Sequence, residues 1–267
     1  MKREASRWLY RRLAPYGVNP FTVVESIRGR PRYRADRAEF IQQLSTAPDA
    51  SSWPMGRDYP CLRDHLGSAG EASGAYFHQD LWVARLIFEA QPRRHVDVGS
   101  RIDGFVAHVA SFRSIDVFDI RPLAVSVPGV TFRQLDITAN SDEFNSCCDS
   151  LSCLHALEHF GLGRYGDRVD VSGWRRGWER LVQMVEKGGT LYISVPIGPQ
   201  RVEFDAHRVF AVPFLTDVFR EQCEIVRFAY VDDQGNFHPD VNLTREEALQ
   251  AFGCTYGCGI FVLRRMA

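Results

Sequence analysis

Three acidic residues stand where short apolar segments end, and their spacing suits the binding of a nucleotide-type ligand. Asp97 and Gly99 close the first segment, Asp119 the second and Asp136 the third. A glycine turn lets the main chain approach a ligand, and a carboxylate about 20 residues further on accepts hydrogen bonds from ribose hydroxyls. We therefore expect an α/β enzyme that holds a nucleotide-type cofactor at the carboxyl ends of parallel strands.

Residues that can move a proton follow the apolar segment at residues 150–154. They are His155, Glu158 and His159, and the two histidines share one face if the chain is helical from Ala156 onward. Free imidazole has a pKa of about 6.5, so such a histidine can take a proton from a hydroxyl group at neutral pH. The spacing also permits a metal ion, but the sequence provides no third ligand, and an interior histidine with a hydrogen-bond partner is an equally good interpretation. We expect no metal site.

Charged residues further along the chain are expected to form the opposite wall of the same site. Glu203, His207 and Arg208 lie between stretches that contain proline and glycine, and loops at strand ends often carry chemistry. We predict that His159 and His207 approach one acceptor from opposite walls and that at least one is a general base, with Glu158 also catalytic. Arg208 and Glu203 are predicted to bind substrate, Arg208 through a phosphate or carboxylate. A salt-bridged surface loop is the alternative interpretation.

Strands and helices alternate along residues 76–267, which is typical of a parallel sheet that could position these groups. We expect strands over 95–98, 115–118, 130–135, 150–154, 190–195, 223–231 and 257–264. We expect helices over 76–90, 105–110, 174–185, 216–221 and 243–252. Lys187, Gly188 and Gly189 are predicted to stop the helix at 174–185. The last two strands lack a full crossover between them, so they should close the sheet as a pair.

Composition limits the classes of protein to consider. A chain of 267 residues with 45% hydrophobic residues suits one α/β domain with attachments, and a net charge of −1 gives no reason to expect a nucleic acid partner. Seven cysteines, without a Cys-x-x-Cys motif, favour a reduced cytoplasmic protein. The sequence shows neither a signal peptide nor an apolar run of about 18 residues.

Residues 1–75 are expected to form a basic arm or lid, separate from a main domain at 76–267. Residues 1–45 contain ten Lys or Arg against four acidic residues, and helical stretches are expected over 5–13 and 35–44. We interpret this arm first as a surface feature. Contact with an anionic membrane or a protein partner is the second interpretation.

The order of elements resembles the class I S-adenosylmethionine-dependent methyltransferases. DVGSRIDG is similar to their glycine-rich first motif, SLSCLHALEHFGLG to their fourth-strand segment and KGGTLYISVPIG to their fifth strand. The resemblance implies a Rossmann-like, mostly parallel seven-stranded sheet with helices on both faces, plus the N-terminal helical arm. It also implies S-adenosylmethionine as cofactor. The residues that it places around this cofactor are Asp97, Gly99, Ser100, Gly104, Asp119, Ile120, Asp136, Ile137 and His155.

A narrower resemblance covers roughly residues 75–265. DVGSRIDGFVAH, FDIRPL, CLHALEHFGLGRYGD and VPIGPQRVEFDAHRVF resemble the family catalogued as domain of unknown function 268, whose name leaves the substrate open. The usual Gly-x-Gly-x-Gly of the first motif is reduced to Gly99 and Gly104. Because a dinucleotide needs the middle glycine for its pyrophosphate, this reduction argues against NAD. It is also compatible with a degenerate pocket.

These observations lead to a methyltransferase that acts on an oxygen, and second on a nitrogen, of a small polar acceptor such as a sugar or glycan intermediate. The histidines favour oxygen, as does the lack of an Asn-Pro-Pro-Tyr motif after residues 150–154. Methyl transfer is an in-line displacement, so the protein mainly positions two ligands and removes one proton. The alternatives are a non-catalytic relative that binds a ligand or partner through the same cleft, and a nucleotide-sugar oxidoreductase. The lack of a Tyr-x-x-x-Lys pair argues against the oxidoreductase.

Overall fold

The structure is a computed structural model that describes residues 16–17, 19–67, 69–70, 72–139 and 142–267. The chain divides into two compact units, Met1–Glu71 and Ala72–Ala267. The helix predicted over residues 5–13 lies outside the described residues. Within the described residues, no helix combines the length and the apolar character needed to span a bilayer.

The first unit is built around one long helix, α2 (Pro20–Leu44), of which the sequence predicted only the second half. Asn19 caps it by accepting a hydrogen bond from the Phe21 N–H at 3.0 Å. The chain then returns through two short 3₁₀ turns, η2 (Ala50–Ser52) and η3 (Asp64–Leu66). Arg63 pairs with Glu25 of the helix at 3.0 Å, so contacts distant in sequence help to keep the first half helical.

The second unit contains an eight-stranded sheet in the order β3-β2-β1-β4-β5-β10-β8-β9. Its strands are β1 (His95–Val98), β2 (Ile115–Asp119), β3 (Val130–Gln134), β4 (Cys148–Leu154), β5 (Val185–Ile197), β8 (Cys223–Val231), β9 (Phe237–His238) and β10 (Gly257–Arg265). The first five are parallel, and β10 runs antiparallel between β5 and β8. The eighth strand is β9, a two-residue addition to the predicted seven that pairs with the end of β8.

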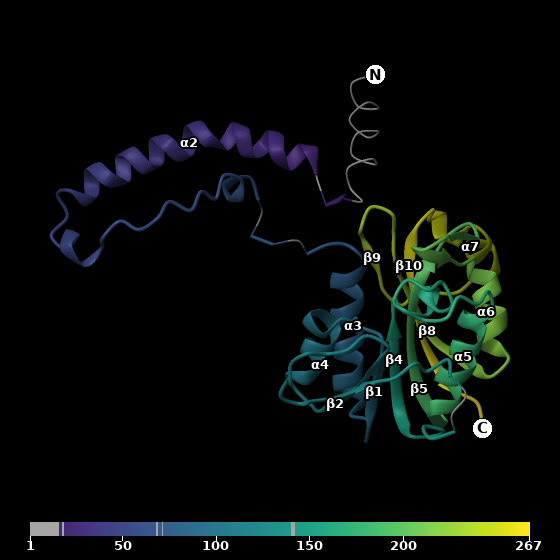
Figure 1. Cartoon of the computed structure of the whole chain (residues 1–267). Helices are drawn as coiled ribbons and strands as arrows, with labels where there is room; N and C mark the ends of the chain where they lie inside the picture. The colour runs from purple at the N-terminus through teal and green to yellow at the C-terminus, as the bar shows by residue number, and fades with distance from the viewer. Residues whose placement is uncertain (1–15, 18, 68, 71, 140–141) are drawn as a thin grey trace. The chain divides into compact units, whose positions relative to one another are not determined.

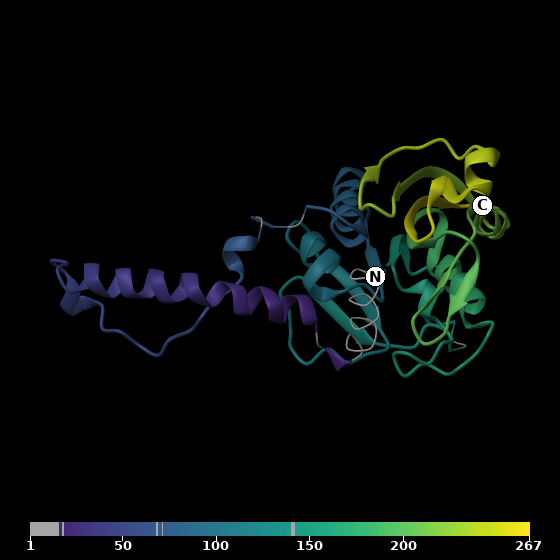
Figure 2. The same cartoon turned by 90° about the horizontal axis from the view of Figure 1, so that it is seen from above.

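Helices cover both faces of this sheet. They are α3 (Ala75–Ala90), the π-type turn η4 (Ile102–Val106) with α4 (Ala107–Ala110), α5 (Gly173–Met184), α6 (Val212–Arg220) and α7 (Arg245–Leu249). Figures 1 and 2 show α3 and α4 on one face and α5 and α6 on the other. Each face has its own apolar core, with Ile87 and Phe105 in one and Trp178 and Phe219 in the other, all almost fully buried. The alternating pattern therefore produced the expected layers.

The structure differs from the sequence analysis at four places, and in each case backbone conformation or strand pairing explains the difference. The helix α5 ends at Met184 and Val185 already pairs with Cys148, so the Lys-Gly-Gly segment lies inside β5 and is not the helix stop. The chain after β4 makes only a 3₁₀ turn, η5 (Leu157–His159), because His155 has a positive φ of 49°.

The remaining two differences lie nearer the C-terminus. The helix predicted over residues 243–252 is divided into α7 and the turn η6 (Ala251–Gly253), because Ala251 and Phe252 have positive φ angles of 48° and 55°. The loop expected after β5 contains a small antiparallel hairpin, β6 (Arg201–Glu203) and β7 (His207–Val209). This hairpin determines where the predicted residues of that loop can reach.

Candidate active site

A cavity of about 510 Å³ opens where β1, β2 and β4 end. Its walls come from the turns after these strands and after β3, together with Tyr76, Gln79 and Asp80 of α3. All of its lining residues belong to the unit Ala72–Ala267. This size lies within the usual range for small-molecule sites, about 300–1,000 Å³. The cavity is therefore where the sequence placed the ligand, at the carboxyl ends of parallel strands.

The glycine turn after β1 forms the floor of the cavity. Gly99 has a φ of +79°, and a Cβ atom there would lie 2.8 Å from the Cβ of Ala156, so glycine is required. The fully buried carboxylate of Asp97 accepts hydrogen bonds from the Ser100 N–H at 3.0 Å and from the Ser152 hydroxyl at 2.5 Å. Burial raises the pKa of Asp97 to about 7.

Asp97 and Gly104 both lie behind the cavity wall, whereas Gly99 and Ser100 line it. Asp97 accordingly stabilises the turn through the hydrogen bonds that it accepts from Ser100. A Cβ atom at Gly104 would lie 2.9 Å from Oδ2 of Asp80, which lines the cavity. Gly104 thus leaves space for a carboxylate that the sequence analysis did not select.

The carboxylate at the end of β2 lines the cavity but already has a partner. Asp119 is 9% exposed and accepts hydrogen bonds from Nε and Nη2 of Arg121, at 3.0 and 2.5 Å, and from the main-chain N–H of Arg121 at 2.8 Å. The same guanidinium lies 4.7 Å from the centre of the Tyr165 ring. A ligand hydroxyl that donates a hydrogen bond to Asp119 must therefore displace Arg121 or share the carboxylate with it.

The turn after β3 supplies a more apolar wall. Ile137 is 6% exposed and lines the cavity with Asp136 of the same turn and with Ile120, which directly follows β2. Asp136 accepts hydrogen bonds from the Thr138 N–H at 2.9 Å and the Thr138 hydroxyl at 2.7 Å. Its carboxylate therefore shapes its own turn, and the aliphatic side chains beside it can cover a flat ring.

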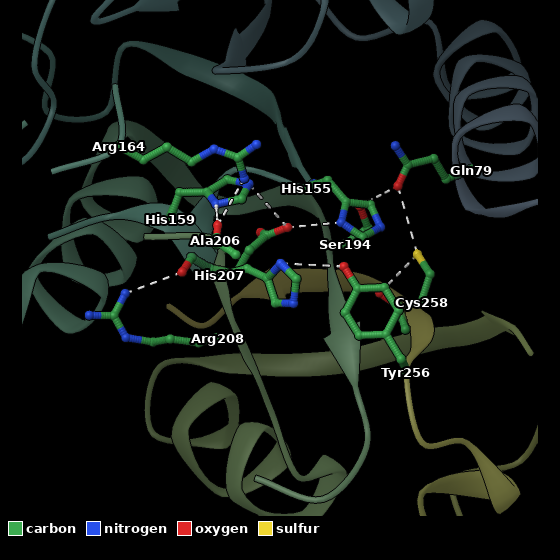
Figure 3. Close-up of polar contacts among 12 residues, drawn as sticks. Gln79, His155, His159, Arg164, Ser194, Ala206, His207, Arg208, Tyr256 and Cys258 are labelled. Atoms are coloured by element: carbon green, nitrogen blue, oxygen red, sulfur yellow. Dashed lines mark hydrogen bonds and ion pairs between the residues drawn. The ribbon is translucent and has the colours of Figure 1, made fainter. Parts of the chain in front are cut away.

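The segment after β4 brings two histidines to one carboxylate. Nδ1 of His155 lies 2.8 Å from Oε1 of Glu158, and Nε2 of His159 lies 3.7 Å from the same oxygen. Glu158 is 1% exposed. His155 and His159 line the cavity, whereas Glu158 lies behind them. Figure 3 shows His155 between His159 on one side and Gln79 and Cys258 on the other.

The β6–β7 hairpin does not bring its predicted residues into this cavity. His207 lies against Tyr256, with ring centres 4.9 Å apart, and its Nε2 is 3.2 Å from Glu203. The Arg208 guanidinium donates to the main-chain carbonyls of Glu158 and Phe160 at 3.2 and 2.7 Å. Among the described residues, the cavity lining includes none of Glu203, His207 and Arg208. The hairpin instead contributes the carbonyl of Ala206, which accepts a hydrogen bond from the His159 Nδ1–H at 2.7 Å.

The sequence analysis missed several residues that line the cavity. Gln79 and Asp80 are 1% and 7% exposed on the otherwise apolar buried face of α3, and burial raises the pKa of Asp80. Two polar residues on such a face are a usable signal, since buried polar groups need partners. Tyr165 also lines the cavity, with Arg164 5.1 Å from its ring centre on the same wall. Nothing in the local pattern indicated that these loop residues turn inward.

Comparison with known families supports the narrower resemblance. The family described as Caenorhabditis protein of unknown function, DUF268, matches residues 130–240. That range contains Glu158, both histidines of the segment after β4 and the β6–β7 hairpin. The family prediction is confirmed over this range. No curated protein matches the chain.

Comparison with solved structures addresses the fold. The cyclase SpnF is similar with a TM-score of 0.52 at 11% identity, over 74% of this chain and 86% of that chain. The N-methyltransferase NodS from Bradyrhizobium japonicum WM9, in complex with S-adenosylhomocysteine, has a TM-score of 0.49 at 14% identity, over 72% of this chain and 88% of that one.

A third similar structure is the 1,6-didemethyltoxoflavin-N1-methyltransferase from Burkholderia thailandensis, solved with S-adenosylhomocysteine. Its TM-score is 0.47 at 14% identity, over 80% of this chain and 94% of that one. The predicted Rossmann-like α/β fold is confirmed by the strand order and by the likeness to the cyclase. Because a cyclase is among the similar proteins, the fold alone does not decide the reaction.

Proposed function

We propose that this chain is an S-adenosylmethionine-dependent methyltransferase that methylates an oxygen of a small polar acceptor, such as a sugar or glycan intermediate. One observation carries this proposal: the cavity lies at the carboxyl ends of β1, β2 and β4, with a carboxylate at the end of β2 and another after β3. In open α/β sheets, ligands bind outside the carboxyl ends of the strands, where the strand order reverses.

The groups around the cavity fit the parts of this cofactor. Ile120 and Ile137 offer aliphatic surface for an adenine ring, and Asp119 can accept hydrogen bonds from ribose hydroxyls. Asp80 supplies a carboxylate for an amino group. The guanidinium of Arg101, which pairs with Asp103 at 3.0 and 2.7 Å, can bind a ligand carboxylate in place of Asp103. When bound, S-adenosylmethionine supplies a methyl group on a sulfonium, whose departure as a neutral thioether requires no acid from the protein.

The side chains that follow β4, where we place the acceptor, support oxygen as the methylated atom. His155 and His159 line the cavity beside the buried carboxylate of Glu158, and a hydroxyl acceptor must lose a proton to such a base. Arg164 lines the same cavity, and its guanidinium forms no ion pair within the described part of the chain. It could therefore bind an anionic or strongly polar group on the acceptor.

The location of the reaction is also part of the proposal. We place it in the cytoplasm, which is supported by the seven cysteines, all of which are free thiols. The basic N-terminal arm is proposed to contact a partner or an anionic surface.

A non-catalytic ligand-binding protein is the second candidate. The observation that favours it is the pair between Asp119 and Arg121, which occupies both carboxylate oxygens that ribose hydroxyls would use. Under this alternative the cavity binds a ligand that does not require Asp119.

Calorimetry on the full chain with S-adenosylmethionine, S-adenosylhomocysteine and NAD separates these functions. We expect both S-adenosyl compounds to bind and NAD not to bind. Transfer of a labelled methyl group to a panel of monosaccharides, uronic acids and nucleotide sugars then tests the acceptor class. Binding without transfer to any hydroxyl compound, but with transfer to amines, would move the acceptor to nitrogen. Failure of both S-adenosyl compounds to bind would overturn the proposal.

A further inference from the structure

The backbone at His155 is held in an unusual conformation by a buried network. His155 has a positive φ of 49°, which a residue with a side chain adopts only when its surroundings enforce it. Its N–H donates to the carbonyl and the hydroxyl oxygen of Ser194 at 3.0 and 3.1 Å. The Ser194 hydroxyl in turn donates to Oε1 of Gln79 at 2.6 Å. Strand β5 and helix α3 therefore position the imidazole together (Figure 3).

The carboxylate of Glu158 determines which ring nitrogen of His155 carries the proton. An ionised carboxylate only accepts hydrogen bonds, so Nδ1 of His155, 2.8 Å from Oε1, is the donor. In the neutral ring the lone pair then lies on Nε2. That atom is buried and has no hydrogen-bond partner among the described residues, while the His155 side chain lines the cavity. A carboxylate that orients a histidine in this way is the usual arrangement around a general base.

His159 is oriented differently although it contacts the same carboxylate. Its Nδ1–H donates to the Ala206 carbonyl at 2.7 Å, so the lone pair of the neutral ring lies on Nε2. This nitrogen faces Oε1 of Glu158 at 3.7 Å. The basic atom of His159 is therefore directed at Glu158, whereas the basic atom of His155 forms no hydrogen bond of ordinary geometry among the described residues, although the Cys258 side chain also interacts with this imidazole.

We propose that Nε2 of His155 is the proton acceptor of this site and that Glu158 positions it. The assignment rests on the proposed function for its role in catalysis. The O–H bond of the acceptor breaks, its proton moves to Nε2, and its electron pair forms the bond to the methyl carbon. The bond between that carbon and sulfur breaks with both electrons left on sulfur. The imidazolium afterwards returns its proton to water.

The groups that face His155 determine the pH above which its neutral, basic form is present. Glu158 and His159 face it from its own segment, Cys258 and Tyr256 from β10 and the loop before it, and Tyr76 and Asp80 from α3. Burial alone would lower the pKa of His155, but the Cys258 sulfur and the Glu158 carboxylate raise it well above 6.5. For His159, burial lowers the pKa. The base form of His155 therefore appears at a higher pH than that of His159.

Diethyl pyrocarbonate tests this assignment without requiring a known acceptor, because it acylates the neutral lone pair of imidazole. The full chain is treated across a pH series, and mass spectrometry measures acylation of His155 and His159. We expect the rate at His155 to rise with a midpoint above 6.5, the ordinary value for histidine. In Glu158→Gln this midpoint should fall by about 1 to 3 pH units, the usual effect of a neighbouring charge on a pKa. In Glu158→Asp, which keeps the charge, the midpoint should stay above the ordinary value.

A matched control comes from a second pair of the same kind. His238 lies 2.9 Å from Asp232, outside the cavity, so Asp232→Asn should leave the midpoint at His155 unchanged. S-adenosylhomocysteine should protect His155 from acylation, since both occupy one cavity. The proposal is wrong if folded wild-type protein is not acylated at His155, or if Glu158→Gln leaves its midpoint unchanged. If these results hold but S-adenosylhomocysteine neither binds nor protects, the assigned base remains and the proposed function fails.

Discussion

The pair between Arg121 and Asp119 should compete with any ligand that places hydroxyl groups on Asp119. Both carboxylate oxygens accept guanidinium N–H groups, at 3.0 and 2.5 Å, at the wall of the cavity. Two substitutions separate the partners of this pair. Asp119→Ala removes the acceptor of the ribose hydroxyls, and Arg121→Gln removes only the competitor. We expect them to change the affinity for S-adenosylhomocysteine in opposite directions.

The magnitudes follow from exposure and charge. The Arg121 side chain is 42% exposed, so its pair with Asp119 contributes at most about 1 kcal/mol. Releasing Asp119 should therefore tighten binding in Arg121→Gln by about 2- to 5-fold. Hydrogen bonds from hydroxyls to a carboxylate contribute about 1.5–3 kcal/mol, and part of this is offset because the pair must first open. Asp119→Ala should weaken binding by about 1 to 2 kcal/mol, or about 5- to 30-fold.

Isothermal titration calorimetry with S-adenosylhomocysteine measures both effects. Arg227→Gln is the matched control, because Arg227 forms a bidentate pair with Asp240 at 2.6 and 2.8 Å outside the cavity and should leave the affinity unchanged. Weaker binding in Arg121→Gln together with unchanged binding in folded Asp119→Ala would refute the reasoning. Arg121 would then contact the ligand itself, and Asp119 would serve only to hold Arg121.

Three further predictions concern the turn after β1 and the N-terminal arm. Gly99→Ala should lower the free energy of unfolding by about 1–3 kcal/mol in urea titrations, because the positive φ disfavours alanine and the new Cβ would lie too close to Ala156. An unchanged urea midpoint would show that the turn can relax. Burial raises the folded-state pKa of Asp97 from an ordinary value of 3.8 to about 7. Between these pH values the folded state retains a proton that the unfolded state releases, so the free energy of unfolding should fall as the pH rises. Asp97→Asn should remove this slope when unfolding is measured across that range, and a slope that persists would assign it to another group. Deleting residues 1–45 should leave a folded chain that still binds S-adenosylhomocysteine by calorimetry, and failure of this shortened chain to fold would place those residues in the main core.

Local sequence determined the sheet and the position of the cavity. The bounds of β1 and β8 agree with the predicted segments 95–98 and 223–231, because short apolar runs between turn residues depend on near neighbours in sequence. Gly99 was also predictable, since a tight turn after a strand needs a residue without Cβ. Once parallel strands form, their carboxyl ends must lie at one edge, so Asp119 and the residues after β4 were expected to meet.

Tertiary structure decided what each polar group does at that edge. Arg208 was predicted to bind substrate, but its guanidinium donates to main-chain carbonyls, because the β6–β7 hairpin directs it behind the segment after β4. Asp80 reaches the cavity only because Gly104, distant in sequence, leaves space for its carboxylate. His155 and His159 have the same side chain and share Glu158, yet their orientations differ. Ser194 of β5 holds the main chain of His155, and the Ala206 carbonyl of the hairpin holds the ring of His159. A hydrogen bond forms only when donor and acceptor lie within about 2.7–3.2 Å of each other, and at this edge residues far apart in the chain establish those distances.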